Sequence, residues 1–145
     1  MRVPAAVMAA CAALACVAGP ASAQPPAPVP VPETPPGTPA AMFLDDPSIV
    51  DAYPNRPQAW SHTADERAVR LHFTIGTPDC YGATATVRET AEDVIVDLRT
   101  GTLPRAAERA CIMIALFAGL DVPLQNPVGA RRVLQRHLTR LDEGG

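Results

Sequence analysis

The chain has 145 residues, a formal net charge of −3 and twelve basic residues, all of which are arginine. Its length suits a single domain. The small net charge gives no electrostatic reason to expect a nucleic acid or another polyanion as a partner. The absence of lysine excludes Schiff-base and lysine-nucleophile chemistry.

The first 23 residues have the features of a secretory signal peptide. Arg2 gives the N-terminus a positive charge, and the run from Val3 to Ala18 is almost entirely apolar. Ala21-Ser22-Ala23 then supplies the small residues that a signal peptidase requires. This order predicts cleavage between Ala23 and Gln24, and export to the cell envelope or the medium.

A bacterial lipobox is the competing interpretation of the same segment. Residues 13–16 read Ala-Leu-Ala-Cys, and a lipid on Cys16 would tether the protein to a membrane. The large aliphatic residue usual at the position of Ala13 is missing, so we favour cleavage after Ala23. A lipid on Cys16 is the one covalent membrane anchor that the sequence offers.

A proline-rich segment follows the predicted cleavage site. Eight of the fifteen residues from Pro25 to Pro39 are proline, which favours an extended polyproline II chain. We predict a disordered linker over residues 24–47 that acts as a spacer. The folded domain is expected over residues 48–141, with Trp60 as a packing anchor, and a flexible tail over residues 142–145.

Alternation of apolar and polar side chains predicts three strands in this domain. They cover Ala68–Ile75, Ala83–Thr90 and Val94–Arg99. The second and third are joined by a short loop and should form an antiparallel hairpin. The side chains expected to point inward are those of Val69, Leu71, Phe73, Ile75, Ala83, Ala85, Val87, Val94, Val96 and Leu98.

Ala110–Leu124 is the most apolar run after the predicted signal peptide. From Ile112 onward every second residue is apolar, which favours one long strand with a bulge near Gly119. The alternative is a buried helix that ends near Ala118 and is followed by a short strand, because this segment contains many good helix formers.

Two further segments are rich in arginine or turn residues. Gly101–Arg109 is predicted to be a loop with one helical turn begun by Pro104. Arg131–Leu141 contains four arginines and His137, with leucines on one helical face. We predict a terminal helix or strand end that packs on the sheet; a basic amphipathic helix on an anionic surface is the alternative.

Cys80 and Cys111 are the two cysteines that remain after the predicted cleavage. An even number of cysteines in an exported chain favours a disulfide, and closing a loop of this length stabilises by about 3–4 kcal/mol. The fold prediction is therefore mainly β. We expect a small antiparallel sheet or sandwich-like domain of about 4–5 strands with one disulfide, and with room for a short helix near residues 105–118 or at the C-terminus.

No residue pattern in the chain predicts catalysis. Neither Ser48 nor Ser61 lies in a G-x-S-x-G elbow. Ser61 and His62 are sequence neighbours, and their side chains point apart in an extended chain. We therefore predict that the protein is not an enzyme.

The histidines and acidic pairs lack the spacing of a metal site. The three histidines are scattered, without an H-x-x-x-H or C-x-x-C pattern, and the acidic pairs fall in predicted loops. No metal or cofactor is expected, and the histidines should be solvated or hydrogen-bonded surface residues. The residues concerned are His62, His72, His137, Asp45, Asp46, Glu92 and Asp93.

Several short motifs resemble a group of uncharacterised actinobacterial exported proteins and lipoproteins. The resemblance covers roughly Arg67 to Val133 and includes Cys80, an E-T corner at Glu89-Thr90 and Cys111. It ends in a V-x-L-x-x-P-L-G-x-R-x-V pattern, in which Val128 stands in place of the leucine. The resemblance implies a secreted β domain with paired cysteines, and it assigns no activity.

The functional prediction is an exported, non-catalytic binding or structural module with an envelope or extracellular partner. A protease-inhibitor-like or ligand-binding module that uses loops around Trp60, His62 and Tyr81 is one alternative. A small hydrolase with a site that no motif reveals is the other. An exposed apolar patch rimmed by loops would favour binding, and a cleft with converging Asp, His and Ser groups would favour the hydrolase.

Overall fold

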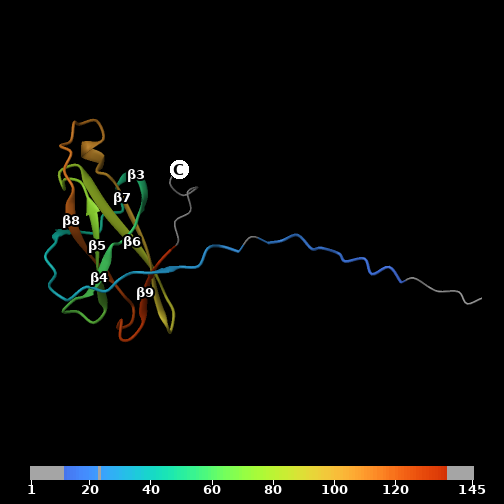
Figure 1. Cartoon of the computed structure of the whole chain (residues 1–145). Helices are drawn as coiled ribbons and strands as arrows, with labels where there is room; N and C mark the ends of the chain where they lie inside the picture. Colours follow the sequence, from blue (N-terminus) through green and yellow to red (C-terminus); the bar gives the residue numbers. More distant parts are fainter. Residues whose placement is uncertain (1–11, 23, 137–145) are drawn as a thin grey trace, which may run out of the picture.

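The computed structural model describes residues 12–22 and 24–136, and from Val29 onward these residues form two packed β-sheets (Figure 1). The elements in chain order are β1 (Val29–Pro30), β2 (Ala41–Phe43), β3 (Val50–Asn55), β4 (Ala59–His62), β5 (Ala68–Ile75), β6 (Tyr81–Glu89), β7 (Asp93–Thr102), the 3-10 turn η1 (Pro104–Ala106), β8 (Leu116–Pro123) and β9 (Arg132–Gln135).

The first sheet is built around β7. Strand β6 pairs antiparallel with β7 along its whole length, from Tyr81 opposite Thr102 to Glu89 opposite Val94. The other edge of β7 is shared: β3 pairs antiparallel with its C-terminal half, and β9 pairs parallel with its first residues. Strand β1 then adds antiparallel to β9.

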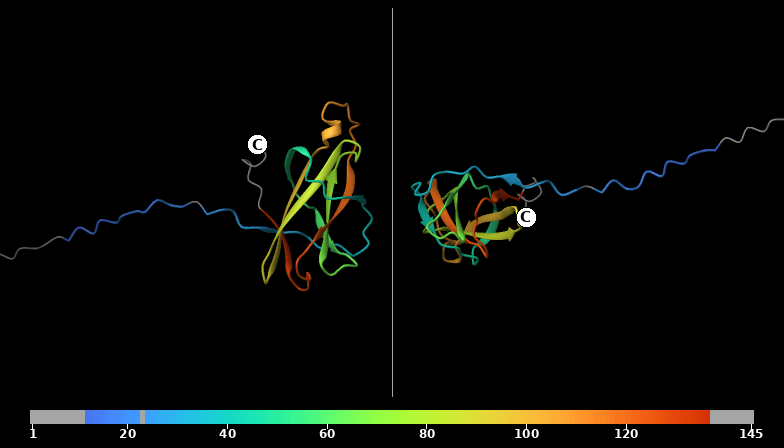
Figure 2. Two further views of the ribbon diagram at one scale, coloured as in Figure 1. Left: turned by 180° about the vertical axis from the view of Figure 1, so that it is seen from behind. Right: turned by 90° about the horizontal axis from the view of Figure 1, so that it is seen from below.

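The second sheet has the order β2-β8-β5-β4. Strand β5 pairs antiparallel with both β4 and β8, whereas β2 runs parallel to β8. The two sheets face each other in both views of Figure 2 and enclose one main core. Its fully buried side chains include Val69, Leu71, Phe73, Val94, Val96, Leu98, Ala118 and Leu120.

The predicted fold class is confirmed. The domain is mainly β and sandwich-like, and the Cys80–Cys111 disulfide is present. The three predicted strands correspond to β5, β6 and β7, and β6 and β7 form the predicted hairpin. The inward residues of β5 and β7 are buried as expected, because alternation with a period of two places them all on the core face.

The prediction of a disordered linker up to residue 47 is wrong from Val29 onward. Val29 and Pro30 pair with β9, and Val31 is buried and donates its N–H to the Val133 carbonyl at 3.0 Å. Proline lacks an N–H but keeps its carbonyl, so a chain in which prolines alternate with other residues can still pair along a sheet edge. Pro32 shows this, because its carbonyl accepts the N–H of Trp60 at 2.9 Å.

The proline-rich chain then crosses the outer face of the second sheet. Glu33 bridges Trp60 at the free edge of β4 and runs parallel to it, and β2 lies at the opposite edge of the same sheet. A connection between parallel edges must cross one face, and the core face is filled. Residues 35–40 therefore form a strap over the outer face, and Ala40 lies against Gly119, where an added Cβ would be 3.3 Å from the Ala40 Cβ.

Strand β8 is shorter than the sequence predicts. The expected strand began at Ala110, but pairing with β5 starts at Leu116 opposite Ile75, where β5 ends. Residues 110–115 continue beyond the sheet without a partner strand, and the only helical turn in this region is η1. The long strand is therefore confirmed from Leu116 onward and wrong before it.

The predictions for the two termini are tested in part. Arg132–Gln135 is strand β9, so the strand-end interpretation applies there and the helical one does not. The remainder of that segment, with His137 and the predicted tail, lies outside the described residues. Ala23 at the predicted cleavage site also lies outside them, whereas Gln24 is exposed and Cys16 is an exposed free thiol. No helix within residues 12–22 and 24–136 is long and apolar enough to cross a membrane.

Candidate functional site

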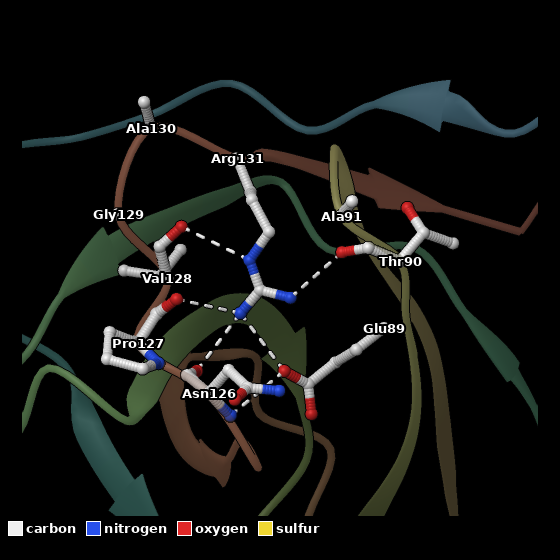
Figure 3. A pocket seen from close by; sticks show the side chains of 9 residues that line it. All are labelled: Glu89, Thr90, Ala91, Asn126, Pro127, Val128, Gly129, Ala130 and Arg131. Carbon is white, nitrogen blue, oxygen red and sulfur yellow. Dashed lines mark hydrogen bonds and ion pairs between the residues drawn. The ribbon is translucent and has the colours of Figure 1, made fainter.

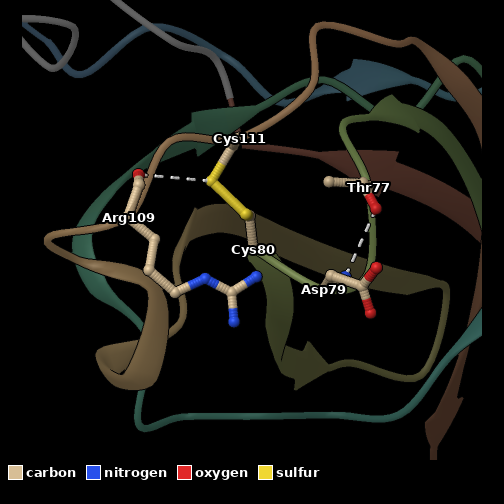
Figure 4. Close-up of a disulfide and its surroundings, with 5 residues drawn as sticks. All are labelled: Thr77, Asp79, Cys80, Arg109 and Cys111. Carbon is tan, nitrogen blue, oxygen red and sulfur yellow. Dashed lines mark hydrogen bonds between the residues drawn. A yellow bond between two sulfur atoms is a disulfide. The ribbon is translucent and has the colours of Figure 1, made fainter.

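The Cys80–Cys111 disulfide anchors a loop at one end of the sandwich (Figure 4). Cys80 lies in the turn between β5 and β6, where its N–H donates to the Thr77 carbonyl at 3.1 Å, and its carbonyl accepts the N–H of Leu103 at 2.8 Å. It is buried in a small apolar cluster with Ile49, Leu103 and Ala106. Cys111 is therefore tied to a fixed point of the domain.

Residues 110–115, here called the disulfide loop, expose consecutive apolar side chains. The relative exposure is 64% for Ile112, 101% for Met113 and 43% for Ile114. The loop belongs to the orange projection at the top of Figure 1, beyond the ends of the strands. A run of exposed apolar residues costs solubility and is usually found where another molecule binds.

The backbone of the disulfide loop is also unpaired. Within the described part of the chain, no backbone–backbone hydrogen bond involves residues 112–115. On its far side, Leu116 enters β8. Residues 112–115, whose N–H and C=O groups have no backbone partner among the described residues, thus lie between two fixed points.

A second site lies at the opposite end of the sandwich, where Glu89 contacts the segment between β8 and β9. The Glu89 carboxylate accepts the N–H of Gln125 at 2.7 Å. It also accepts the N–H of Asn126 at 3.3 Å and an N–H of Arg131 Nη2 at 3.0 Å (Figure 3). These bonds, with the Gln125 N–H the strongest and Arg131 next, hold the pKa of Glu89 below its ordinary value. We call this pair the Glu89–Arg131 clamp.

All three nitrogens of the Arg131 guanidinium donate hydrogen bonds in the clamp. Nε donates to the Val128 carbonyl, Nη1 donates to the Thr90 carbonyl, and Nη2 also reaches the carbonyls of Asn126 and Pro127. The clamp therefore ties the β6–β7 turn to the segment between β8 and β9. The clamp residues line the pocket drawn in Figure 3. Because these donors already bond acceptors within the protein, the arrangement has a structural explanation that needs no ligand.

A third group of residues brings a serine and a histidine together. Ser61 Oγ and His72 Nε2 are 3.0 Å apart, and the two residues are 1% and 0% exposed. Phe117 stacks on the His72 ring with centroids 5.4 Å apart. The expectation that His72 is a surface residue is therefore wrong: His72 lies on the outer face of its strand, but Phe117 stacks on its ring there and the residue is buried.

The buried pair lacks the features by which a serine hydrolase works. Within the described residues, His72 Nδ1 has no hydrogen-bond partner, so no acid orients the ring. Burial lowers the pKa of His72, which favours the neutral ring, with Arg70 adding to this effect and Asp121 opposing it. Ser61 and His72 form a closed hydrogen-bonded pair in the outer layer of the sheet.

The residues proposed from sequence for a binding site do not come together. Trp60 is 5% exposed and packs in the core. The ring centres of Trp60 and His62 are 4.9 Å apart, and His62 Nε2 is 3.3 Å from Glu33 Oε1. His62 pairs with Val69 near the start of β5, whereas Tyr81 follows the end of β5. The Trp60 and His62 pair and Tyr81 therefore belong to opposite ends of the sandwich.

The acidic pairs serve local structure. Asp45 accepts hydrogen bonds from Thr84 and Ala85, and Asp93 pairs with Arg132 at 2.8 Å. Among the residues that the structure describes, no three His, Cys, Asp or Glu side chains are grouped so that they could hold a metal ion. The hydroxyl and the backbone N–H of Ser48 donate hydrogen bonds to the Asp46 carboxylate, and these bonds lower the pKa of Asp46.

Two sites were missed by reasoning from sequence. The alternation of Ile112 and Ile114 continues that of β8, and it therefore predicts a strand where the structure has the disulfide loop. The signal against this was the length of β5, since eight residues can pair with only eight of the fifteen residues from 110 to 124. The clamp carried a partial signal, because the E-T corner and Arg131 both belong to the motifs of the resemblance.

Comparisons with protein-family models, with curated proteins and with solved structures find no match to this chain.

Proposed function

We propose that this protein is an exported, non-catalytic binding module whose contact surface is the disulfide loop. The observation that carries the proposal is the complete exposure of Met113 between two exposed isoleucines on a loop with a disulfide at its base. Apolar side chains held in water at a fixed position bind a partner with little further loss of conformational entropy.

Export remains part of this proposal. The disulfide suits an oxidising compartment, and the first 23 residues have the pattern of a signal peptide. We also propose that the chain belongs with the actinobacterial exported proteins that it resembles. The Glu89–Arg131 clamp supplies a structural role for the E-T corner and the P-x-G-x-R residues of that pattern.

The loop can be tested by affinity capture with two variants. The loop variant carries Ile112→Ser, Met113→Ser and Ile114→Ser. The control is Leu44→Ser, because Leu44 is also apolar and 89% exposed but follows β2, away from the loop. All three proteins are used as bait for envelope extract and culture medium, with isotope-coded quantification.

We expect a partner that the native protein and the Leu44→Ser control retain and that the loop variant loses by roughly 30-fold or more, as for an interface hot spot. Matching unfolding curves for the three proteins would show that the variants are folded. Equal recovery of every protein by all three baits would refute the loop as the contact surface.

A further inference from the structure

We infer that the partner of the disulfide loop is an endopeptidase with an apolar primary pocket, and that the loop occupies its cleft as a substrate does, with Met113 in the pocket. This inference rests on the proposed function and names the partner class for the same surface. It follows from the backbone of the loop, from the position of Met113 and from the two points that hold the loop.

The unpaired backbone identifies the kind of surface that the loop fits. Residues 112–115 present N–H and C=O groups that make no backbone hydrogen bond within the described residues. A partner that pairs with an added extended segment satisfies these groups and gains affinity from them. Insertion of the same loop into a lipid layer would leave them unsatisfied, because the hydrocarbon core offers no hydrogen-bond partners.

The charges near the loop also disfavour a lipid surface. Arg105, Glu108 and Arg109 are exposed just before Cys111. They carry both signs, whereas attraction to an anionic membrane needs a cluster of basic residues. The loop surface is therefore suited to a protein cleft.

Met113 is the side chain suited to a primary pocket. It is 101% exposed, more than either neighbour, and its side chain is long and unbranched. Endopeptidases with a hydrophobic slot at the primary pocket recognise an apolar side chain on the residue that precedes the cleaved bond. Met113 in that pocket places the Met113–Ile114 peptide bond at the catalytic group.

The anchors of the loop explain why such a complex would persist. Hydrolysis of the Met113–Ile114 bond by water breaks one C–N bond, giving a carboxylate on Met113 and an amine on Ile114. Cys111 stays attached to Cys80 through the disulfide, and Leu116 stays in β8 between β2 and β5. The two new ends remain close together at a high effective concentration, so product release is slow and the bond can re-form.

The test uses the purified disulfide-bonded protein with three endopeptidases. Chymotrypsin and subtilisin accept apolar residues at the primary pocket, whereas trypsin has an aspartate there and requires a basic residue. Residual activity on a small chromogenic substrate is measured against the concentration of the protein. We expect stoichiometric inhibition of at least one of the two apolar-pocket enzymes and none of trypsin.

A change of specificity gives the sharper result. Met113→Lys should lose inhibition of the apolar-pocket enzyme by roughly 30-fold or more and gain inhibition of trypsin by a similar factor. Leu44→Lys is the matched control and should change neither. Mass spectrometry of long incubations should locate slow cleavage at residue 113 in the native protein.

Removal of the anchor separates an inhibitor from an ordinary substrate. The Cys80→Ser, Cys111→Ser form should be cleaved rapidly near residue 113 and should not inhibit. The inference would be overturned if the native protein inhibits neither apolar-pocket enzyme, or if both enzymes degrade it rapidly. If the loop-dependent partner of the capture experiment is then found not to be a peptidase, the proposed function stands without this partner class. Loop-dependent binding to phosphatidylcholine or phosphatidylglycerol vesicles, without inhibition, would overturn both.

Discussion

The two ends of the sandwich treat their polar groups in opposite ways. At the end with the Glu89–Arg131 clamp, one guanidinium bonds a carboxylate and four carbonyls, so that the turns there are joined by paired groups. At the disulfide end, residues 112–115 make no backbone hydrogen bond to any other described residue, and Ile112, Met113 and Ile114 are exposed. We therefore expect the first end to stabilise the fold, and we propose the second as the contact surface.

The largest expected effect is loss of the disulfide that supports the exposed end. Replacement of Cys80 and Cys111 by serine reopens a loop with a sequence separation of 31 residues. We expect a decrease in the free energy of unfolding of about 4 kcal/mol, measured by urea denaturation. A decrease below about 1 kcal/mol would mean that the loop is held by other contacts.

The clamp should have the next largest effect. Arg131→Met leaves the Glu89 carboxylate and several carbonyls without their donor while keeping much of the side-chain volume, and we expect a loss of about 3 kcal/mol. The side chains of Arg131 and Glu89 are 10% and 15% exposed, so solvent replaces the lost bonds poorly. Arg132→Met is the control, because Arg132 forms an ion pair with Asp93 while 66% of its side chain is exposed; its effect should stay below about 1 kcal/mol.

A smaller effect is expected from pH at the buried Ser61–His72 pair. The pKa of His72 is lowered in the folded protein from its ordinary 6.5, chiefly by burial. Above pH 6.5 the ring is neutral in both the folded and the unfolded state, so His72 adds no pH dependence. As the pH falls below 6.5, His72 becomes protonated in the unfolded chain but stays neutral in the folded protein. The free energy of unfolding therefore decreases, by at most about 1.4 kcal/mol per pH unit.

His72→Gln tests that pH dependence. Glutamine can keep a hydrogen bond to Ser61 but does not titrate, so the slope of stability against pH between 6.5 and the lowered pKa should become flatter than in the native protein. The measurement is a series of urea titrations at different pH values. An unchanged slope would assign the pH dependence to titratable groups other than His72.

The smallest effect is expected from the exposed loop. Met113→Ser removes an apolar side chain that is exposed in the folded protein, so the free energy of unfolding should change by less than about 0.5 kcal/mol. The same urea titrations measure it. A loss above 1 kcal/mol would show that Met113 contributes to the fold, and the contrast between the two ends would fail.

The sequence predicted the interior of this protein better than its edges. The inward residues of β5 and β7 follow from alternation alone, because each faces the same core along its whole length. The edge strand β1 was missed because it lies in a proline-rich segment, and β2 was missed because it has only three residues. The pairing partner that stabilises each of them lies far away in the chain.

The candidate site depended on contacts that local patterns do not contain. By alternation His72 has the position of a surface residue, yet it is buried, with Phe117 stacked on its ring. Ile112 and Ile114 have the pattern of strand residues, and only the end of β5 leaves them exposed. In both cases the deciding information was the length or the path of another segment.

The pairing of β1 with β9 has a consequence for the order in which the domain can form. Val29 pairs with Gln135, so β1 cannot pair until β9, which is synthesised more than 100 residues later, is available. Contacts of such long sequence separation form late and slowly. Until Arg132–Gln135 is available, the edge of β7 at Val94–Val96 stays open to other strands, and the incomplete domain is most prone to misassembly in that interval.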